Sequence, residues 1–292
     1  MDGCHALGIR MGQWGYYVSS GKRKRGRRGL QAGIGFFRSM EESIPPNTFI
    51  AGDCLELLPY LPSKSIDSVI TDAPYNLTQN RWDTPFDIDA WWHQIKRVTR
   101  HGVIMTARNP FAAKVIAANL NGFRWDDVWE KNNATGFLNA QRMPLRAHEL
   151  ILVFGSPKYF PQKSTGHRPV HTYIKHRPDG TNYVKTRCGW SGGGSTERYP
   201  RSVVRFPVVR NDGSGEPKIH PTQKPVVLFE YLVLTFTEPG DLILDPFCGS
   251  GTTAVAAVTH GRSFICFDKD AAMVEKARSR LLPFLKGQAR ET

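Results

Sequence analysis

Four aspartates in this sequence each end or closely follow a short apolar run, and their carboxylates are the first candidates for chemistry. The runs "TFIAGD", "DSVITD", "DLILD" and "SFICFD" end at Asp53, Asp72, Asp245 and Asp268. Short apolar runs of this kind predict buried strands. In an open α/β sheet, ligands bind outside the carboxyl ends of the strands. We therefore expect the four carboxylates to line one edge of a sheet.

Asp72 belongs to "ITDAPYNL", residues 70 to 77. Pro74 restrains the residue before it to extended geometry, so the strand should end at a polar turn. That turn presents Asp72 and Tyr75 close together. Taken alone, the segment is equally consistent with an ordinary strand end.

The most informative segment is "LILDPFCGSGTTAVAA". A strand ends at Asp245. In the turn after it, Gly249 and Gly251 let the backbone approach a ligand closely, and Thr252 then opens a helix. Neither the Gly-Lys-Ser/Thr ending of a Walker motif nor the third glycine of a dinucleotide fingerprint is present. A second strand ends about 20 residues later in Asp268, where a carboxylate can accept hydrogen bonds from both ribose hydroxyls. The pattern indicates a nucleoside-binding half-sheet; alternatively, the glycines only form a turn and Asp268 caps the last helix.

Strands and helices alternate around these residues. Apolar runs predict strands at 48–53, 67–72, 102–107, 124–131, 148–155, 241–245 and 263–268. Helical patterns occur at 54–61, 88–100, 109–121, 225–236, after the glycine turn, and at 271–285, with Asn109 as a cap and Pro110 at the first helical position. Strands separated by helices predict a mostly parallel sheet that is covered on both faces.

The alternation is interrupted by one basic segment. Between residues 155 and 218, 12 Lys or Arg stand against 4 Asp or Glu, with aromatic residues interspersed. That composition suits contact with phosphates and bases, although an irregular solvated insertion has the same appearance. We expect residues 45–155 and 219–285 to form one α/β domain, 156–218 an insertion, 286–292 a tail, and 1–44, which contain "GKRKRGRRGL", a mobile basic arm.

Composition narrows the function classes. The net charge of +13 favours a polyanionic partner such as nucleic acid, or else a generally basic surface. The 5 cysteines form no Cys-x-x-Cys pair and their number is odd, which favours a reducing cytoplasm over a disulfide framework or a zinc site. No apolar run of about 18 residues predicts a membrane span, and no secretion signal opens the chain.

Three motifs, in this order along the chain, resemble those of amino-directed DNA methyltransferases of the permuted β class. "DAPYNL" is similar to their catalytic motif, "HPTQKP" (220–225) to their cofactor-flanking motif, and "DPFCGSGTT" to their S-adenosylmethionine motif. The resemblance covers residues 47–283 apart from the insertion. It implies a Rossmann-like class I methyltransferase fold, circularly permuted, with a target-recognition region at 156–218 and a setting in the cytoplasm of a bacterial or phage-infected cell.

The resemblance also assigns residues to S-adenosylmethionine. Asp245 and the turn after it would hold the methionine part, and Asp268 the ribose. Asp53, with the backbone of Cys54, would meet the adenine ring, while Lys224 would close over the carboxylate end. The full implied cofactor set is Asp53, Cys54, Lys224, Asp245, Pro246, Phe247, Gly249, Gly251, Thr252 and Asp268.

The implied catalytic residues are Asp72, Ala73, Pro74 and Tyr75. The Asp72 carboxylate and a main-chain carbonyl would accept the two N–H groups of a base's exocyclic amine, which localises the nitrogen lone pair for in-line attack. Tyr75 would stack on a base flipped out of the duplex. No metal and no nucleophilic side chain are needed. Ala73 departs from the family pattern, where Pro is usual, but its carbonyl remains available, so we expect activity to be retained.

Further segments carry weaker expectations. "LTQNRWDTPF" is either a loop over the base, with Arg81 and Trp82 as contacts, or a segment that Trp82 packs down. "WEKNN" and "RAHELILVF" resemble strands that support the base pocket, and we expect His148 and Glu149 to be structural.

Double-stranded DNA is the expected partner and N6 of adenine the expected acceptor, because Asp opens the catalytic motif. N4 of cytosine is the nearest alternative, and a nucleic-acid-binding module with a relict cofactor fold is an alternative of another class. The sequence leaves open whether the protein forms a homodimer or works with a restriction endonuclease.

Overall fold

The computed structural model describes residues 44–80, 82–174, 191–210 and 216–288 of the 292-residue chain. Almost all of the predicted basic arm, Arg81 and parts of the basic insertion lie outside these residues. Ile44, which the sequence assigned to the arm, is buried in the core.

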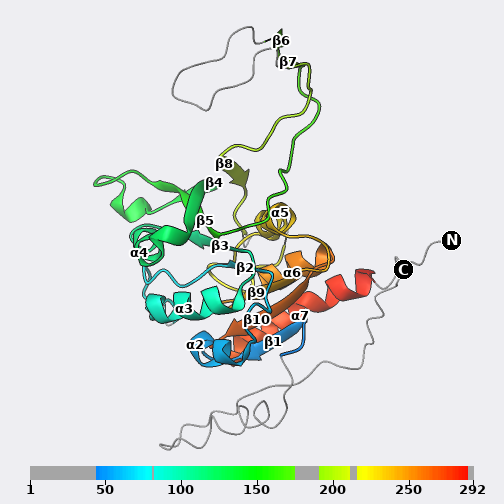
Figure 1. The fold of residues 1–292 in the computed structure, drawn as a ribbon. Coiled ribbons are helices and arrows are strands. Elements are labelled where there is room, and N and C mark those ends of the chain that lie inside the picture. Colours follow the sequence, from blue (N-terminus) through cyan, green and yellow to red (C-terminus); the bar gives the residue numbers. More distant parts are fainter. Residues whose placement is uncertain (1–43, 81, 175–190, 211–215, 289–292) are drawn as a thin grey trace, which may run out of the picture.

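An eight-stranded sheet forms the centre of the described chain, in the order β1-β10-β9-β2-β3-β5-β4-β8 (Figure 1). Neighbouring strands pair in parallel except where β5 runs antiparallel to β3 and β4. The mostly parallel sheet is therefore confirmed. The strand bounds are β1 Thr48–Ala51, β2 Ser68–Thr71, β3 Gly102–Ala107, β4 Phe123–Thr135, β5 Arg146–Gly155, β8 Val203–Phe206, β9 Leu242–Asp245 and β10 Ser263–Asp268.

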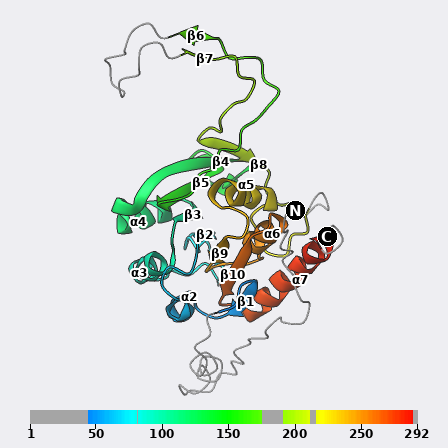
Figure 2. The same cartoon turned by 45° about the vertical axis from the view of Figure 1, so that its right-hand side comes forward.

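Helices cover both faces of this sheet (Figure 2). One core cluster joins α2, α3 and α4 to one set of strand residues, and a second joins α5, α6 and α7 to the alternate set. Successive residues of a strand point to opposite faces, so Phe49 belongs to one cluster and Ile50 to the other. The helices are α2 Cys54–Leu57, α3 Ile88–Val98, α4 Phe111–Ala118, α5 Val226–Phe236, α6 Thr252–Thr259 and α7 Ala271–Gln288, with short 3₁₀ turns η1 Leu58–Tyr60, η2 Leu120–Gly122 and η3 Phe137–Asn139.

Two helix ends differ from expectation. α4 begins at Phe111, with Pro110 as its N-cap residue and no capping side chain, so Asn109 does not serve as the cap. α7 continues to Gln288, into the predicted tail. None of the described helices is long and apolar enough to span a bilayer.

The last two strands of the chain lie in the middle of the sheet. β9 and β10 are placed between β1 and β2, which come first in the sequence. A sheet assembled from both ends of the chain is what a circular permutation requires, because the spatial order of the strands is kept while their sequence order changes.

The basic insertion is not uniformly irregular. β8, within the predicted insertion, pairs in parallel with β4, and the Trp129 indole donates a hydrogen bond to the Phe206 carbonyl at 2.9 Å. Next to β5, Lys158 forms an ion pair with Asp241 at 2.9 Å. Parts of the segment after residue 156 therefore belong to the sheet and to its packing, and the division into domains stays a prediction.

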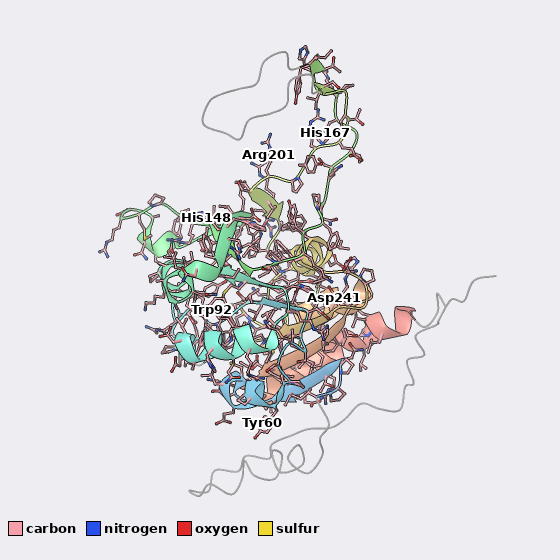
Figure 3. All side chains as sticks on the ribbon, viewed as in Figure 1. Tyr60, Trp92, His148, His167, Arg201 and Asp241 are labelled. Carbon is pink, nitrogen blue, oxygen red and sulfur yellow. The ribbon has the colours of Figure 1, made fainter. Side chains whose placement is uncertain are left out.

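The remainder of the insertion extends away from the body. β6 (Tyr173–Ile174) and β7 (Ser191–Gly192) form a two-stranded hairpin that lies well apart from the main sheet in both ribbon views (Figures 1 and 2). In Figure 3, His167 lies on the extended segments that lead to it and Arg201 where they return to β8, whereas Trp92 is packed inside the body. An exposed extension of this kind has the reach to contact a large ligand.

Two glycines of the turn between β9 and α6 have positive φ values but different surroundings. Gly251 (φ +75°) packs so closely that a Cβ atom there would lie 2.9 Å from the Ala277 Cβ atom and 3.3 Å from the Phe49 ring. Gly249 (φ +48°) has no atom within 4 Å of the same position. Gly251 is therefore required by packing as well as by backbone conformation, and Gly249 leaves open space at the edge of the sheet.

This difference predicts unequal effects of alanine. Gly251→Ala should combine left-handed backbone strain of about 1–2 kcal/mol with an overpacking cost of about 1–3 kcal/mol. Gly249→Ala, the matched control, should lose only the strain contribution. Urea unfolding of both variants measures the two free energies, and equal losses would contradict the packing role of Gly251.

Candidate active site

Four adjacent strands bring the strand-end aspartates to one edge. The four strands neighbour one another in the order β1, β10, β9 and β2. They end at or just before Asp53, Asp268, Asp245 and Asp72, in the same order. The expected common edge is confirmed, and the separate roles of the four residues stay predictions.

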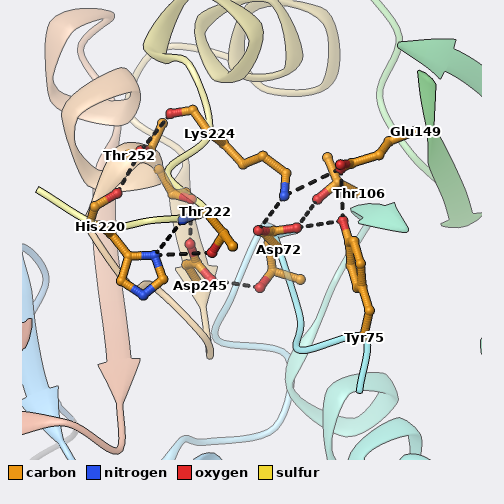
Figure 4. A network of polar contacts seen from close by, with 12 residues as sticks. Asp72, Tyr75, Thr106, Glu149, His220, Thr222, Lys224, Asp245 and Thr252 are labelled. Carbon is orange, nitrogen blue, oxygen red and sulfur yellow. Dashed lines mark hydrogen bonds and ion pairs between the residues drawn. The ribbon is translucent and has the colours of Figure 1, made fainter. Parts of the chain in front are cut away.

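Asp72 is the centre of a polar network drawn in Figure 4. Its Oδ1 atom accepts hydrogen bonds from the Tyr75 hydroxyl at 2.7 Å and from the Thr106 hydroxyl. Its Oδ2 atom accepts one from the Lys224 ammonium at 2.7 Å. These donors come from the catalytic turn, from β3 and from the segment before α5. The Ala73 side chain beside them is buried in the core, and Pro74 is half-buried.

Lys224 lies between two carboxylates. Its Nζ atom is 2.7 Å from Asp72 Oδ2 and 3.4 Å from Glu149 Oε2, and its side chain is only 8% exposed. Burial acts to lower the pKa of Lys224, but Asp72 and Glu149 outweigh it and raise that pKa. The sequence predicted that Lys224 would face the cofactor carboxylate; the structure directs its ammonium to Asp72.

Glu149 is part of this network, although the sequence marked it as structural. It lies on β5 and accepts hydrogen bonds from Tyr75 and from Lys131 of β4. Burial acts to raise the pKa of Glu149, but Lys224 and Lys131 hold it well below its usual range. The alternation of residues along β5 could place Glu149 on a face of the sheet, but only the packing of β3, β4 and β5 shows what it meets.

Tyr75 is held at both ends. Its hydroxyl donates to Asp72 and Glu149, and its ring stacks on Phe111 with centroids 5.4 Å apart. Burial, followed by the charges of Asp72 and Glu149, raises the pKa of Tyr75 well above its ordinary value. The residue therefore remains a neutral hydrogen-bond donor at neutral pH, with a ring fixed beside the Asp72 carboxylate.

Asp245 points into the protein. Its carboxylate accepts hydrogen bonds from the Thr71 hydroxyl at 2.6 Å, from the Phe247 amide at 3.1 Å and from the Thr253 hydroxyl. Burial raises the pKa of Asp245 to about 7. The carboxylate thus fastens β9 to β2 and α6, and it shapes the glycine turn from within.

Thr252 is likewise internal, because its hydroxyl donates to the Lys224 carbonyl at 3.2 Å and it is buried. This bond connects the start of α6 to the 220–225 segment. Arg280 of α7 reinforces the junction by bonding the Thr252 hydroxyl at 3.1 Å and by pairing with Glu216 at 3.2 Å.

Asp268 and the glycine turn fit a nucleoside. Each Asp268 oxygen accepts one backbone N–H, from Gly249 at 2.8 Å and from Asp270 at 2.9 Å, and retains a further acceptor position. Burial raises the pKa of Asp268. Asp270, whose carboxylate accepts from the Ala272 amide, caps α7, so the alternative role of Asp268 as that cap is wrong. Phe247 adds an aromatic ring to this turn, and its centroid lies 4.9 Å from that of the Phe86 ring.

Asp53 and Cys54 complete the edge. Asp53 caps α2 through the Leu55 amide at 2.9 Å and pairs with Lys269 at 2.9 Å. The Cys54 side chain is buried, and burial raises the pKa of its thiol to about 12. Only the backbone of Cys54 is therefore suited to meet a ligand. Pro246 is buried below the turn.

The loop after the catalytic turn has a defined shape. Asp83 accepts hydrogen bonds from the backbone amides of Asn76, Leu77 and Thr78, which closes the loop on itself. Trp82 packs against His220, with ring centroids 4.9 Å apart. Two segments of the site that are far apart in sequence, 77–86 and 220–225, are therefore in contact.

No three His, Cys, Asp or Glu side chains within the described ranges are arranged to hold a metal ion. The network is built from carboxylates, ammonium groups and hydroxyls. Such groups orient hydrogen bonds and hold charge.

The family model described as DNA methylase matches residues 66–279. Among curated relatives, the DNA adenine methyltransferase YhdJ of Escherichia coli is 28% identical over 258 residues, which span 80% of this chain and 82% of the relative.

Two solved structures are similar in fold. The M1.HpyAVI–SAM complex has a TM-score of 0.53 at 22% identity and covers 80% of this chain and 98% of its own. The PvuII DNA methyltransferase, described as cytosine-N4-specific, has a TM-score of 0.56 at 18% identity and covers 82% and 87%. Each has the Rossmann-like class I arrangement seen here.

The buried ion cluster predicts a strong stability effect. Lys224→Met should lower the free energy of unfolding by about 3–5 kcal/mol, because it leaves the Asp72 carboxylate without its cation and the Glu149 carboxylate with Lys131 alone. Adding Glu149→Gln should recover part of this loss, because one of the two like charges is removed. Urea unfolding of the wild type, both single variants and the double variant gives the coupling energy.

Lys163→Met is the matched control, because the ion pair of Lys163 with Glu197 is exposed to solvent. This variant should change stability little. Additive effects of Lys224→Met and Glu149→Gln would contradict the cluster.

Proposed function

This chain belongs to the DNA methylase family, and on that premise we propose that it transfers a methyl group from S-adenosylmethionine to the N6 amino group of adenine in duplex DNA. The coarser statement, that it is a DNA methyltransferase of the N6/N4 kind that uses S-adenosylmethionine, follows from the family and its relatives. The observation that supports methyl transfer to an exocyclic amine is the oriented Asp72 carboxylate beside Tyr75.

Asp72 retains room for a substrate. A carboxylate offers about four acceptor positions. Tyr75 and Thr106 occupy two on Oδ1, and Lys224 occupies one on Oδ2. An N–H of the target amine can take the remaining position on Oδ2 without displacing any of these donors.

The chemistry requires only that the amine be held and aimed. Its lone pair is delocalised into the base, and acceptance of its N–H groups by Asp72 and a main-chain carbonyl favours a pyramidal, nucleophilic nitrogen. Lys224 holds the Asp72 carboxylate in position through their ion pair at 2.7 Å. S-adenosylmethionine, when bound, supplies a methyl group on a positively charged sulfur that leaves readily.

The cofactor would lie along β9, β10 and β1. We assign the ribose to Asp268, the methionine part to the turn at Gly249, and the adenine ring to the neighbourhood of Asp53 and the Cys54 backbone. The open space at Gly249 and the free acceptor positions of Asp268 support this placement. Asp245 and Thr252 would act from inside, by holding the turn in shape.

The DNA would be read by the basic insertion. The described part of residues 156–218 includes the exposed extension that ends in β6 and β7. Its lysines and arginines suit the phosphate backbone, which dominates affinity for DNA. The basic arm at 1–44 is a further candidate that lies almost wholly outside the described residues.

Adenine is favoured over cytosine by two observations. The relative YhdJ is named a DNA adenine methyltransferase, and Asp opens the catalytic motif. Incubation of unmethylated genomic DNA with labelled cofactor, followed by nucleoside analysis, should yield N6-methyladenine. A product of 4-methylcytosine would overturn the adenine assignment alone, and absence of any labelled nucleoside would count against DNA as the substrate.

The role of Asp72 is tested by removing its charge. Asp72→Asn should reduce methyl transfer by about 100-fold or more, because one of the acceptors that localises the amine is weakened. Cofactor affinity, measured by isothermal titration, should change little. Asp67→Asn is the matched control at the opposite end of the same strand, where Asp67 pairs with Arg100, and it should retain activity. Retention of full activity in Asp72→Asn would refute the mechanism.

A further inference from the structure

The loop between β4 and β5, residues 136–145, exposes large apolar side chains. Phe137 and Leu138 are 80% and 99% exposed, and Met143 and Leu145 are 45% and 42% exposed. In Figure 1 this β4–β5 loop projects from the body beyond the ends of the two strands. The described chain leaves Phe137 and Leu138 almost wholly uncovered, and large exposed apolar side chains gathered on one loop indicate a contact site.

The β4–β5 loop is held in a defined conformation. Gly136 adopts a φ of +92°, and the amides of Asn139, Ala140 and Arg142 donate to the carbonyls of Gly136, Phe137 and Asn139 at 2.9–3.0 Å. These bonds form the η3 turn, which presents Phe137 and Leu138 outward. The apolar side chains are therefore preorganised for a partner, and binding would require little further ordering.

The β4–β5 loop lies on the same edge as Asp72. β4 is antiparallel to β5, which is antiparallel to β3, so β4 points in the direction of β2 and β3. Its last residue, Thr135, pairs with Arg146, the first residue of β5. Three residues after Arg146 stands Glu149 of the catalytic network. In Figure 3, His148 marks this part of β5 next to the loop.

Arginines surround the base of the loop. Arg108, which follows β3, is close enough to Arg146, Glu149 and Tyr75 for their charges to act on it. The Nε atoms of Arg108 and Arg146 are buried and have no hydrogen-bond partner among the described residues. Both side chains are partly exposed, and a guanidinium group suits the phosphates of a nucleic acid strand.

We propose that the β4–β5 loop is a wedge that enters the DNA stack when the target base leaves it, with Phe137 and Leu138 filling the gap while Arg108 and Arg146 hold the adjacent phosphates. Phe and Leu are among the side chains that proteins insert between base steps, and removal of a base from the stack costs a few kcal/mol that a filler offsets. The inference rests on the proposed function, because it requires a base to be flipped toward Asp72.

A duplex is a better occupant than a second copy of the chain. The protein carries a net charge of +13, and the loop itself contains Arg142 with Arg146 directly after it. A second copy would bring like charges together, whereas DNA brings the opposite charge. The β4–β5 loop also lies on the same edge as Asp72, so it is near the gap that a base flipped toward Asp72 would leave in the duplex.

The test compares two DNA substrates after the methylated sequence has been read from DNA of cells that express the protein. One duplex carries the target base in its normal pair; the other carries it opposite an abasic site, where the base leaves the stack more easily. The double variant Phe137→Ala/Leu138→Ala should lose about tenfold or more in kcat/KM on the paired duplex and approach the wild type on the abasic duplex. Leu120→Ala, which removes a 66% exposed leucine in the η2 turn before β4, should behave as the wild type on both.

The outcomes separate the wedge from the proposed function. Equal activity of the double variant and the wild type on the paired duplex overturns the wedge, and so does an equal loss on both substrates. A wild-type dimer that the double variant converts to a monomer in sedimentation assigns the loop to a second copy and overturns it as well. A wild type that methylates neither duplex overturns the proposed function together with the wedge.

Discussion

The site depends on one ammonium group buried between two carboxylates. Lys224 reaches Asp72 and Glu149 from the segment that precedes α5. Taking a charge out of water is expensive, and only well-placed partners offset that cost. Several segments must therefore be correctly placed at once for the buried charges to be stable. They are the carboxyl ends of β2 and β3, the strand β5 and the 220–225 segment. Residues 152 positions apart in the chain are joined in this way.

The same constraint connects the turn at residues 72–75 to the glycine turn after β9. The Lys224 carbonyl accepts the hydrogen bond of Thr252, which opens α6 after the glycine turn. Asp245 then fastens that turn to β2 from inside. Asp72 and the glycine turn are thus joined by one continuous set of buried contacts. A permuted chain order has no effect on this geometry, since the sheet edge is defined by the spatial order of its strands. The β4–β5 loop leaves the sheet beside this edge, whereas the basic insertion leaves it at the opposite end of β5, where Gly155 pairs with Gly102.

The sequence determined much of this arrangement by local rules. Short apolar runs located β1, β2, β3, β9 and β10 to within a few residues. Because parallel strands present their carboxyl ends on one edge, the four aspartates that close such runs were correctly placed together. The glycine turn was likewise evident, since the backbone conformation that glycine permits is a local property. The helices on both faces followed from the alternation of elements.

The tertiary structure decided which side chains from different elements become partners. No local sequence pattern predicts four of these contacts. They are the inward direction of Asp245, the pairing of Lys224 with Asp72, the contacts of Glu149 and Lys131 in the network, and the pairing of β8 with β4. Each depends on which distant segments pack together and on which buried charges must then be paired. The sequence by itself thus determined the edge and the residue types along it. The three-dimensional packing determined which of those residues turn into the protein, because most polar groups that become buried need a hydrogen-bond partner.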